Sequence, residues 1–232
     1  MGKVKKLLLI QPHSDDLLFS CSHLLFDDSF EKQVLTIENN PKRIKEDKEL
    51  YSFLSIKFNH LDVPFDDQSY YGYHKAYKEV TVEDSYNYLL EFFNKQILDD
   101  IECQLREFLN RFFKENKKND VVVVAPWGVG HPFHIFVRDL IEKILSDVTI
   151  WYYREFPHSY KKRSKIQVEK QQNEYQLLHS MPIESFEDIK WSLSKKFYKT
   201  QSGLLFFEQG YIKKKLPEEL YTTKLKKSYE SH

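Results

Sequence analysis

The sequence predicts an α/β fold in which helices cover both faces of a Rossmann-like, mostly parallel sheet. Short aliphatic runs alternate along the chain with segments of helical periodicity. The clearest run, DVVVVAP at 120–126, places four valines between Asp and Pro, which is typical of a strand buried on both faces. The 232 residues suffice for one ordinary domain, and 6 glycines and 8 prolines are too few for a turn-rich β-sandwich.

The first part of the chain is expected to contain three strands and two helices. VKKLLLI (4–10), closed by Pro12, predicts the first strand, and the aspartates after it begin a helix through LLFSCSHLLF (17–26). The second strand is QVLTI (33–37), followed by a helix over RIKEDKELYSFLSI (43–56), and the third is FNHLDVPF (58–65). The stretch DDQSYYGYHKAYKEV (66–80) has no clear period and is expected to be a loop.

The second part continues the alternation and then becomes helical. A long helix is expected over 83–114, with a break near Asp99 and Asp100. After the valine strand, WGVGH (127–131) predicts a turn, PFHIFVRDLIEKIL (132–145) a helix and VTIWYYR (148–154) a strand. We expect residues 160–232 to be a lysine-rich helical extension of a single domain that spans 1–232, with WSLSKKFYKTQSGLLFF (191–207) as its best helix.

Charge and cysteine content narrow the classes of protein. Thirty-five basic residues balance thirty-five acidic ones, so the chain lacks the basic excess expected for binding nucleic acid or an anionic membrane. Cys21 and Cys103 lack metal-type spacing and read as reduced thiols. The start of the chain has no apolar run of about 7–15 residues for a secretory signal, and no segment reaches the ~18 apolar residues of a transmembrane helix. A cytoplasmic location is expected, and the oligomeric state is left open.

Two polar clusters follow predicted strands. QPHSDD (11–16) comes directly after the first strand and GVGH (128–131) after the valine strand. Ligand sites of open α/β sheets lie beyond the carboxyl ends of the strands, so the clusters can meet. His131 and His134 are spaced i, i+3, and with His13 and Asp16 they give three histidines and a carboxylate. Two histidines, a carboxylate and an open position make a catalytic zinc site, which leaves one histidine free near the metal. Asp15 would then be a candidate base for a metal-bound water.

Each of these residues also has an ordinary explanation. An aspartate at the start of a helix usually caps it, and a histidine after a strand is usually a hydrogen-bonded structural residue. The same donor set also fits a non-haem iron oxygenase, although such sites commonly lie in all-β barrels. The joint placement of the residues at two strand ends favours a metal site.

PHSDDL resembles the PHPDDE signature of the PIG-L/LmbE-like N-deacetylases, which are zinc-dependent enzymes that remove acyl groups from amino sugars. GHPFHIFV resembles the second motif of that family, Gly-His-x-Asp-His followed by apolar residues. RIKEDKEL, LDVPFDD, WYYREFPHSY and KFYKTQ resemble further family segments. The similarity runs in order over about residues 5–205.

The resemblance implies an LmbE-like fold and a role for each site residue. His13, Asp16 and His134 would be the zinc ligands, with another divalent metal such as Fe²⁺ also possible. Asp15 would be the general base, and His131 would stabilise the oxyanion or help to protonate the departing amine. The implied substrate is an N-acetylated amino sugar or glycoconjugate. The residues expected to contact it are Arg43, Trp127 and Arg154.

Three departures from the family pattern lie beside these residues. Ser14 replaces a proline, Leu17 a glutamate and Phe133 the aspartate of the second motif. A phenyl ring cannot orient a histidine or raise its pKa as a carboxylate can. We therefore expect an intact metal site with an altered acid-base partner. The alternative is a weakened or inactive family member that binds metal and sugar without efficient turnover.

Overall fold

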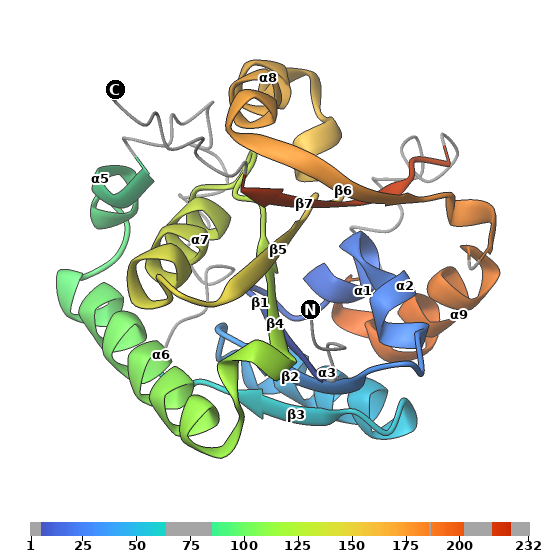
Figure 1. The fold of residues 1–232 in the computed structure, drawn as a ribbon, viewed down its shortest axis with the longest axis horizontal. Helices are drawn as coiled ribbons and strands as arrows, with labels where there is room; N and C mark the ends of the chain where they lie inside the picture. The colour runs from blue at the N-terminus through green and yellow to red at the C-terminus, as the bar shows by residue number, and fades with distance from the viewer. Residues whose placement is uncertain (1–5, 64–84, 186, 202–214, 224–232) are drawn as a thin grey trace, which may run out of the picture.

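Seven strands form one open sheet in the order β3-β2-β1-β4-β5-β7-β6 (Figure 1). The computed structural model describes residues 6–63, 85–185, 187–201 and 215–223. The strands are β1 (Lys6–Gln11), β2 (Glu31–Thr36), β3 (Lys57–His60), β4 (Val121–Pro126), β5 (Thr149–Tyr153), β6 (Tyr175–Met181) and β7 (Glu218–Thr223). The first five are parallel, and β6 and β7 are antiparallel additions beside β5. The predicted fold class is confirmed.

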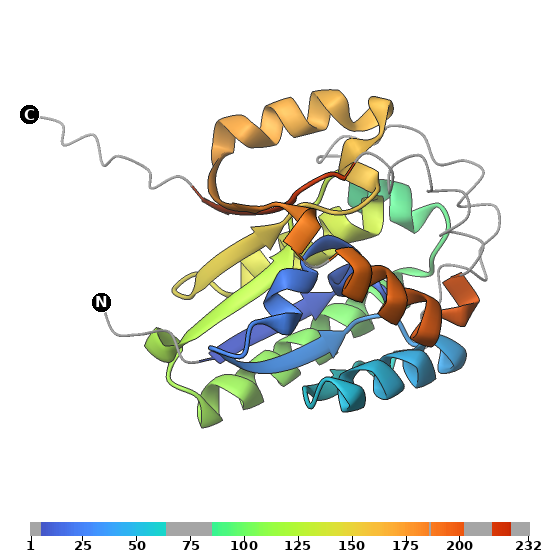
Figure 2. The same ribbon diagram turned by 90° about the vertical axis from the view of Figure 1, so that its right-hand side faces the viewer.

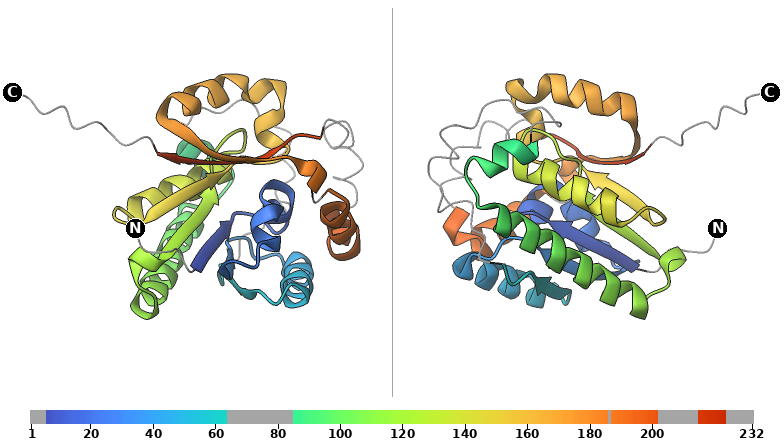
Figure 3. Two further views of the ribbon diagram at one scale, coloured as in Figure 1. Left: turned by 45° about the vertical axis from the view of Figure 1, so that its right-hand side comes forward. Right: turned by 90° about the vertical axis from the view of Figure 1, so that its left-hand side faces the viewer.

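Alternate residues of the central strands point to two separate apolar layers. Leu8 and Val123 belong to one hydrophobic cluster, whereas Leu9 and Val124 belong to the other, and all four are fully buried. The first layer packs beneath α5 (Ser85–Leu90), α6 (Lys95–Glu115) and α7 (Pro132–Ile144) (Figure 3). The second packs beneath α1 (Asp16–Ser20), α2 (Ser22–Phe26), α3 (Pro41–Phe53) and α9 (Glu187–Phe197). Burial on both faces explains why β1 and β4 are continuous aliphatic runs.

Two predicted helices differ from the structure in where they are interrupted. The helix expected over 17–26 is split into α1 and α2 at Cys21, whose φ of −147° is not helical. The long helix is broken between α5 and α6, and it continues through Asp99 and Asp100. Asn94 explains the break, because its side chain accepts a hydrogen bond from the Gln96 N–H and so caps α6.

The region after residue 160 is only partly helical. It contains α8 (Lys165–Glu174) and α9, but β6 and β7 extend the sheet, with α8 lying along this end of it (Figure 2). β7 reads EELYTT and pairs with β5 through Tyr152 and Tyr221, a contact between distant parts of the chain that local periodicity does not reveal. The helix expected over 191–207 begins earlier, at Glu187, and ends at Phe197, and residues 202–207 lie outside the described chain.

The remaining elements are short 3-10 helices that lie mainly in the loops after β5. They are η3 (Lys118–Asp120), η4 (His158–Tyr160), η5 (Lys162–Ser164), η6 (Ile183–Ser185) and η7 (Lys199–Gln201). The loop expected over 66–80 lies outside the described residues. Within the described chain, no helix has the length and apolar character needed to cross a membrane. The cytoplasmic location stays a prediction.

Candidate metal centre

The two polar clusters meet where the order of the parallel strands reverses. β1 lies between β2 and β4, and the chain leaves the sheet after Gln11 and after Pro126 at the same edge. Such a switch point opens a crevice beyond the carboxyl ends of neighbouring strands. Segment 12–16 and the start of α7 bring four side chains together there: His13, Asp16, His131 and His134, which we call the metal-donor cluster.

The donor atoms of this cluster are close enough to share one ion. His13 Nδ1 is 3.0 Å from His134 Nε2, and Asp16 Oδ2 is 3.4 Å from the first atom and 3.3 Å from the second. One ring nitrogen of His131 joins those of His13 and His134 within 4.8 Å. All four side chains are buried, with His134 at 0% exposed.

These separations match the geometry of a small metal ion. Two donors bound to one tetrahedral zinc at about 2.0–2.1 Å are about 3.3 Å apart. A proton can bridge one pair of such atoms, whereas a metal ion can engage all three together. The predicted ligands His13, Asp16 and His134 are therefore brought together as a set that fits a metal, and His131 is close enough to be a further donor.

The backbone around Asp15 does not support the explanation that this residue is a helix cap. Asp15 is at the N-cap position of α1, but its side chain makes no capping hydrogen bond and its φ is 98°, which is rare outside glycine. Asp16 instead accepts a hydrogen bond from the His13 N–H at 2.7 Å. The turn thus folds back on itself and directs both carboxylates away from the helix end.

Arg43 connects Asp15 to a third acidic side chain, Glu38. Its guanidinium donates to Asp15 Oδ1 at 3.1 Å, to Glu38 Oε1 at 3.0 Å and to the Ser14 carbonyl at 2.6 Å. The first turn of α3 aims Arg43 here, because Asn40 caps that helix and Pro41 begins it. All three charged groups are buried, so Asp15 is held in one orientation.

Burial and charge act oppositely on the two aspartates. Burial, reinforced by the charges of Asp16 and Glu38, raises the pKa of Asp15 well above its ordinary value, although Arg43 opposes the shift. Burial would also raise the pKa of Asp16, but His134 and His13 outweigh it, and the pKa of Asp16 is lowered. Asp16 is thus favoured as an ionised ligand, while Asp15 has the higher proton affinity.

His131 is at the N-cap of α7, directly before Pro132. Its ring is 4.9 Å from the ring of His13, 4.7 Å from that of His134 and 4.9 Å from that of His158. The i, i+3 spacing thus brings His131 and His134 together as predicted. Phe133 is fully buried in the core, and its ring is 5.4 Å from the His13 ring, so it packs against a predicted ligand.

The three residues proposed to contact a substrate are placed differently. Arg43 reaches the site but is held by Asp15 and Glu38. Trp127 is 0% exposed, and its indole stacks on Tyr221 at 4.1 Å between ring centroids. Arg154 pairs with Glu219 at 2.6 Å and covers the Tyr160 ring. No contact described for Trp127 or Arg154 reaches the metal-donor cluster, and a role in substrate binding stays a prediction for all three.

Two neighbours of the site were not singled out from the sequence. Glu38 is the second residue after β2, at the same edge of the sheet. It could have been predicted from the sequence, because ligand sites lie beyond the carboxyl ends of the strands. His158 follows β5 within the motif-like segment WYYREFPHSY, and its ring lies 5.4 Å from that of His134. Its position depends on the fold of the loop after β5, which has no periodic signal.

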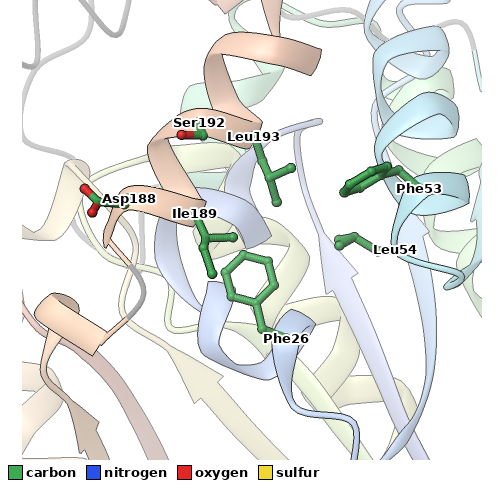
Figure 4. Close-up of a pocket in the computed structure, with 7 residues that line it drawn as sticks. All are labelled: Phe26, Phe53, Leu54, Asp188, Ile189, Ser192 and Leu193. Carbon is green, nitrogen blue, oxygen red and sulfur yellow. The ribbon is translucent and has the colours of Figure 1, made fainter.

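A second recess lies at the opposite edge of the sheet and has different chemistry. It is a groove of about 340 Å³ between the ends of α2 and α3 and one side of α9 (Figure 4). Phe26, Phe53, Leu54, Ile189 and Leu193 supply its apolar walls, with Asp188 and Ser192 at its border. None of the residues that line this groove is a histidine or a cysteine, whereas the metal-donor cluster contains three histidines.

Comparisons with models of known protein families, with curated proteins and with solved structures found no match.

Proposed function

We propose that the protein is a zinc-dependent hydrolase of the PIG-L/LmbE type that removes an acetyl group from the amine of an N-acetylated amino sugar or glycoconjugate. The observation that carries the proposal is the meeting of His13, Asp16 and His134 within 3.4 Å of one another. The PHSDDL and GHPFH motifs supply these residues and place Asp15 next to a ligand.

His13, Asp16 and His134 would hold the ion. A bound divalent metal polarises a carbonyl and makes hydroxide available near neutral pH, which an unreactive amide requires. Borderline nitrogen and oxygen donors suit zinc, and a site with three protein ligands leaves a position open. The open α/β sheet argues against the iron oxygenase alternative, whose sites commonly lie in β-barrels.

Asp15 is proposed to accept a proton from the attacking water. Arg43 fixes the orientation of this carboxylate, and the left-handed backbone at Asp15 keeps its side chain away from the helix end. A general base needs both a defined position and a raised proton affinity, and Asp15 has both.

His131 is proposed to stabilise charge on the carbonyl oxygen or to return a proton to the departing amine. Its ring lies 4.9 Å from that of His13 and 4.7 Å from that of His134, beside the donors. A fixed hydrogen-bond donor at this place lowers the barrier as negative charge develops on oxygen.

The phenyl ring at position 133 favours a second candidate function. In it, the protein is a family member that binds metal and sugar with little turnover. The ring is fully buried where the family motif has an aspartate, so this position supplies no carboxylate to the histidines. A weakly oriented His131 would slow proton transfer without changing the affinity for the metal.

Acetate release from N-acetylglucosamine derivatives, measured with zinc present, tests the leading proposal. We expect Asp15→Asn to lower kcat by at least about 100-fold while zinc remains bound, because general base catalysis contributes on the order of 10²–10⁴. Asp28→Asn, which changes an exposed aspartate before β2, is the control and should retain activity. Failure of the zinc-loaded wild type to release acetate from any derivative would count against a deacetylase.

Phe133→Asp separates the two candidates, with Phe133→Leu as the control for lost core packing. A rate gain in Phe133→Asp alone identifies a weakened catalyst. No gain, together with tight sugar binding by the wild type, identifies a binding protein. Because Phe133 is buried in the core, the melting temperature of both variants must be recorded beside the rate.

A further inference from the structure

The carboxylate of Glu155 lies behind the metal-donor cluster, two residues beyond β5. Its side chain is 0% exposed. Oε1 accepts hydrogen bonds from the backbone N–H groups of Gly128 and Val129, which fix its position relative to the turn that leads to His131. Oε2 has no hydrogen-bond partner among the residues that the structure describes.

Glu155 faces the side of His134 that points away from the other donors. Oε1 is 3.6 Å from His134 Nδ1, whereas Nε2 of the same ring is 3.0 Å from His13 Nδ1 and 3.3 Å from Asp16 Oδ2. In the described chain, Nδ1 has no acceptor within hydrogen-bond distance, so a movement of a few tenths of an ångström would give it one at Glu155. The two nitrogens of His134 thus face two different partners.

The charge of Glu155 also lacks an ordinary counter-ion. No lysine or arginine of the described residues forms an ion pair with it, and the adjacent Arg154 pairs with Glu219 instead. An ionised carboxylate that is fully buried requires a compensating positive charge nearby. The group that faces it is His134, which becomes part of a cationic unit when it binds a metal ion.

We propose that Glu155 is a positioning residue for the metal centre, which accepts a hydrogen bond from His134 Nδ1 and so directs Nε2 to the ion. A carboxylate in this place fixes the tautomer of a ligating histidine and raises its basicity. The inference rests on the metal centre of the proposed function, but it concerns affinity for the ion rather than the identity of a substrate. It also explains why a carboxylate without a basic partner is buried at this edge of the sheet.

Zinc affinity of full-length Glu155→Gln, measured by competition with a chelator, tests the proposal. Loss of such a partner typically lowers metal affinity 10–100-fold, and we expect a loss of about that size. Glu46→Gln is the matched control, because Glu46 is also a buried carboxylate but accepts its hydrogen bonds from Thr200. The melting temperature of each metal-free variant shows whether a loss of affinity is only a loss of folding.

A second measurement needs no variant. In the zinc-loaded wild type, long-range ¹H–¹⁵N NMR should show His134 protonated on Nδ1 and without a proton on Nε2. The inference is overturned if His134 binds zinc through Nδ1, or if Glu155→Gln retains wild-type affinity. A wild type that binds no zinc would instead remove the metal centre itself, which is a failure of the proposed function.

Discussion

Two buried polar clusters each draw two residues from the segment 13–23, and both combine histidine with a carboxylate. One is the metal-donor cluster. The other, which we call the Glu218 cluster, contains Ser22, His23, Lys190 and Glu218. In the Glu218 cluster, Oε1 accepts from Ser22 and Lys190 at 2.7 Å each, and Oε2 accepts from the His23 backbone at 3.0 Å and pairs with its ring at 2.7 Å.

The difference between the clusters lies in the source of positive charge. Lys190 supplies a permanent cation to Glu218 at 1% exposure, so that cluster is neutralised by the chain itself. In the described chain, Asp16 pairs only with His13 and His134, which carry no permanent charge. Residues of the same types therefore serve structure in one place and can bind an ion in the other. The following variants test that distinction.

The largest expected effect is on the Glu218 cluster. Lys190→Met leaves the Glu218 carboxylate buried without its cation and should lower the free energy of unfolding by about 3–5 kcal/mol. Urea denaturation measures the loss, and Lys195→Met, on an exposed position of the same helix, should change it by less than about 0.5 kcal/mol. The double variant Lys190→Met/Glu218→Met should recover much of the stability. Equal stability of Lys190→Met and the wild type would show that the ion pair is not structural.

The same cluster should make stability depend on pH in the acid range. Burial opposes ionisation, but Lys190 and His23 outweigh it and lower the pKa of Glu218 to about 2 from its usual 4.5. The stabilisation is present above pH 4.5 and is lost as the pH falls towards 2, because the unfolded state takes up the proton first; it amounts to about 3 kcal/mol. Urea denaturation at pH 7, 4.5 and 2.5 should show a steeper decline for the wild type than for Glu218→Gln. Parallel curves would contradict the assignment.

A histidine from each cluster gives the direct comparison. His134→Ala removes one donor and should weaken zinc binding by at least about 100-fold, or about 2.7 kcal/mol. It should also abolish the rise in melting temperature that zinc produces in the wild type. His23→Ala should lower stability but leave zinc affinity unchanged. The distinction fails if both variants lose zinc to the same degree.

The parallel half of the sheet could be predicted from sequence, and the carboxyl-terminal half could not. Aliphatic runs such as Val121–Val124 show burial on both faces directly. β6 is largely exposed and β7 carries two glutamates, so neither resembles a buried strand, and their pairing joins residues 37 to 48 positions apart. Long-range pairing of an antiparallel edge depends on tertiary context.

The candidate site shows the same limit on a smaller scale. His13, Asp16 and His134 were predicted because they follow strands whose ends must meet. The ion pair of Arg43 with Asp15 could not be foreseen, since it needs the positive φ at Asp15 and the capped start of α3. Glu155 was expected at the rim of the pocket because it follows a strand, but its approach to His134 and the position of His158 depend on the irregular loop after β5.

The last prediction has the smallest expected effect. It tests whether the geometry of the metal-donor cluster depends on the turn before His131, as the stability of the Glu218 cluster depends on its ion pair. Gly128 and Gly130 both have positive φ, 75° and 76°, so alanine at either position should cost about 1–2 kcal/mol of folding stability. They differ in their surroundings. A Cβ at Gly130 would lie 2.8 Å from the His158 carbonyl oxygen, whereas at Gly128 the nearest atom, at 3.0 Å, is the end of the flexible Arg138 side chain.

Gly130→Ala must therefore displace backbone next to His131, and Gly128→Ala need only move an arginine. We expect a lower melting temperature in Gly130→Ala than in Gly128→Ala, and weaker zinc binding in Gly130→Ala alone. Equal zinc affinities would mean that the turn can shift without moving His131 and His134, because α7 holds both residues in place. In that case helix packing, rather than the conformation of the turn, would determine the geometry of the donors.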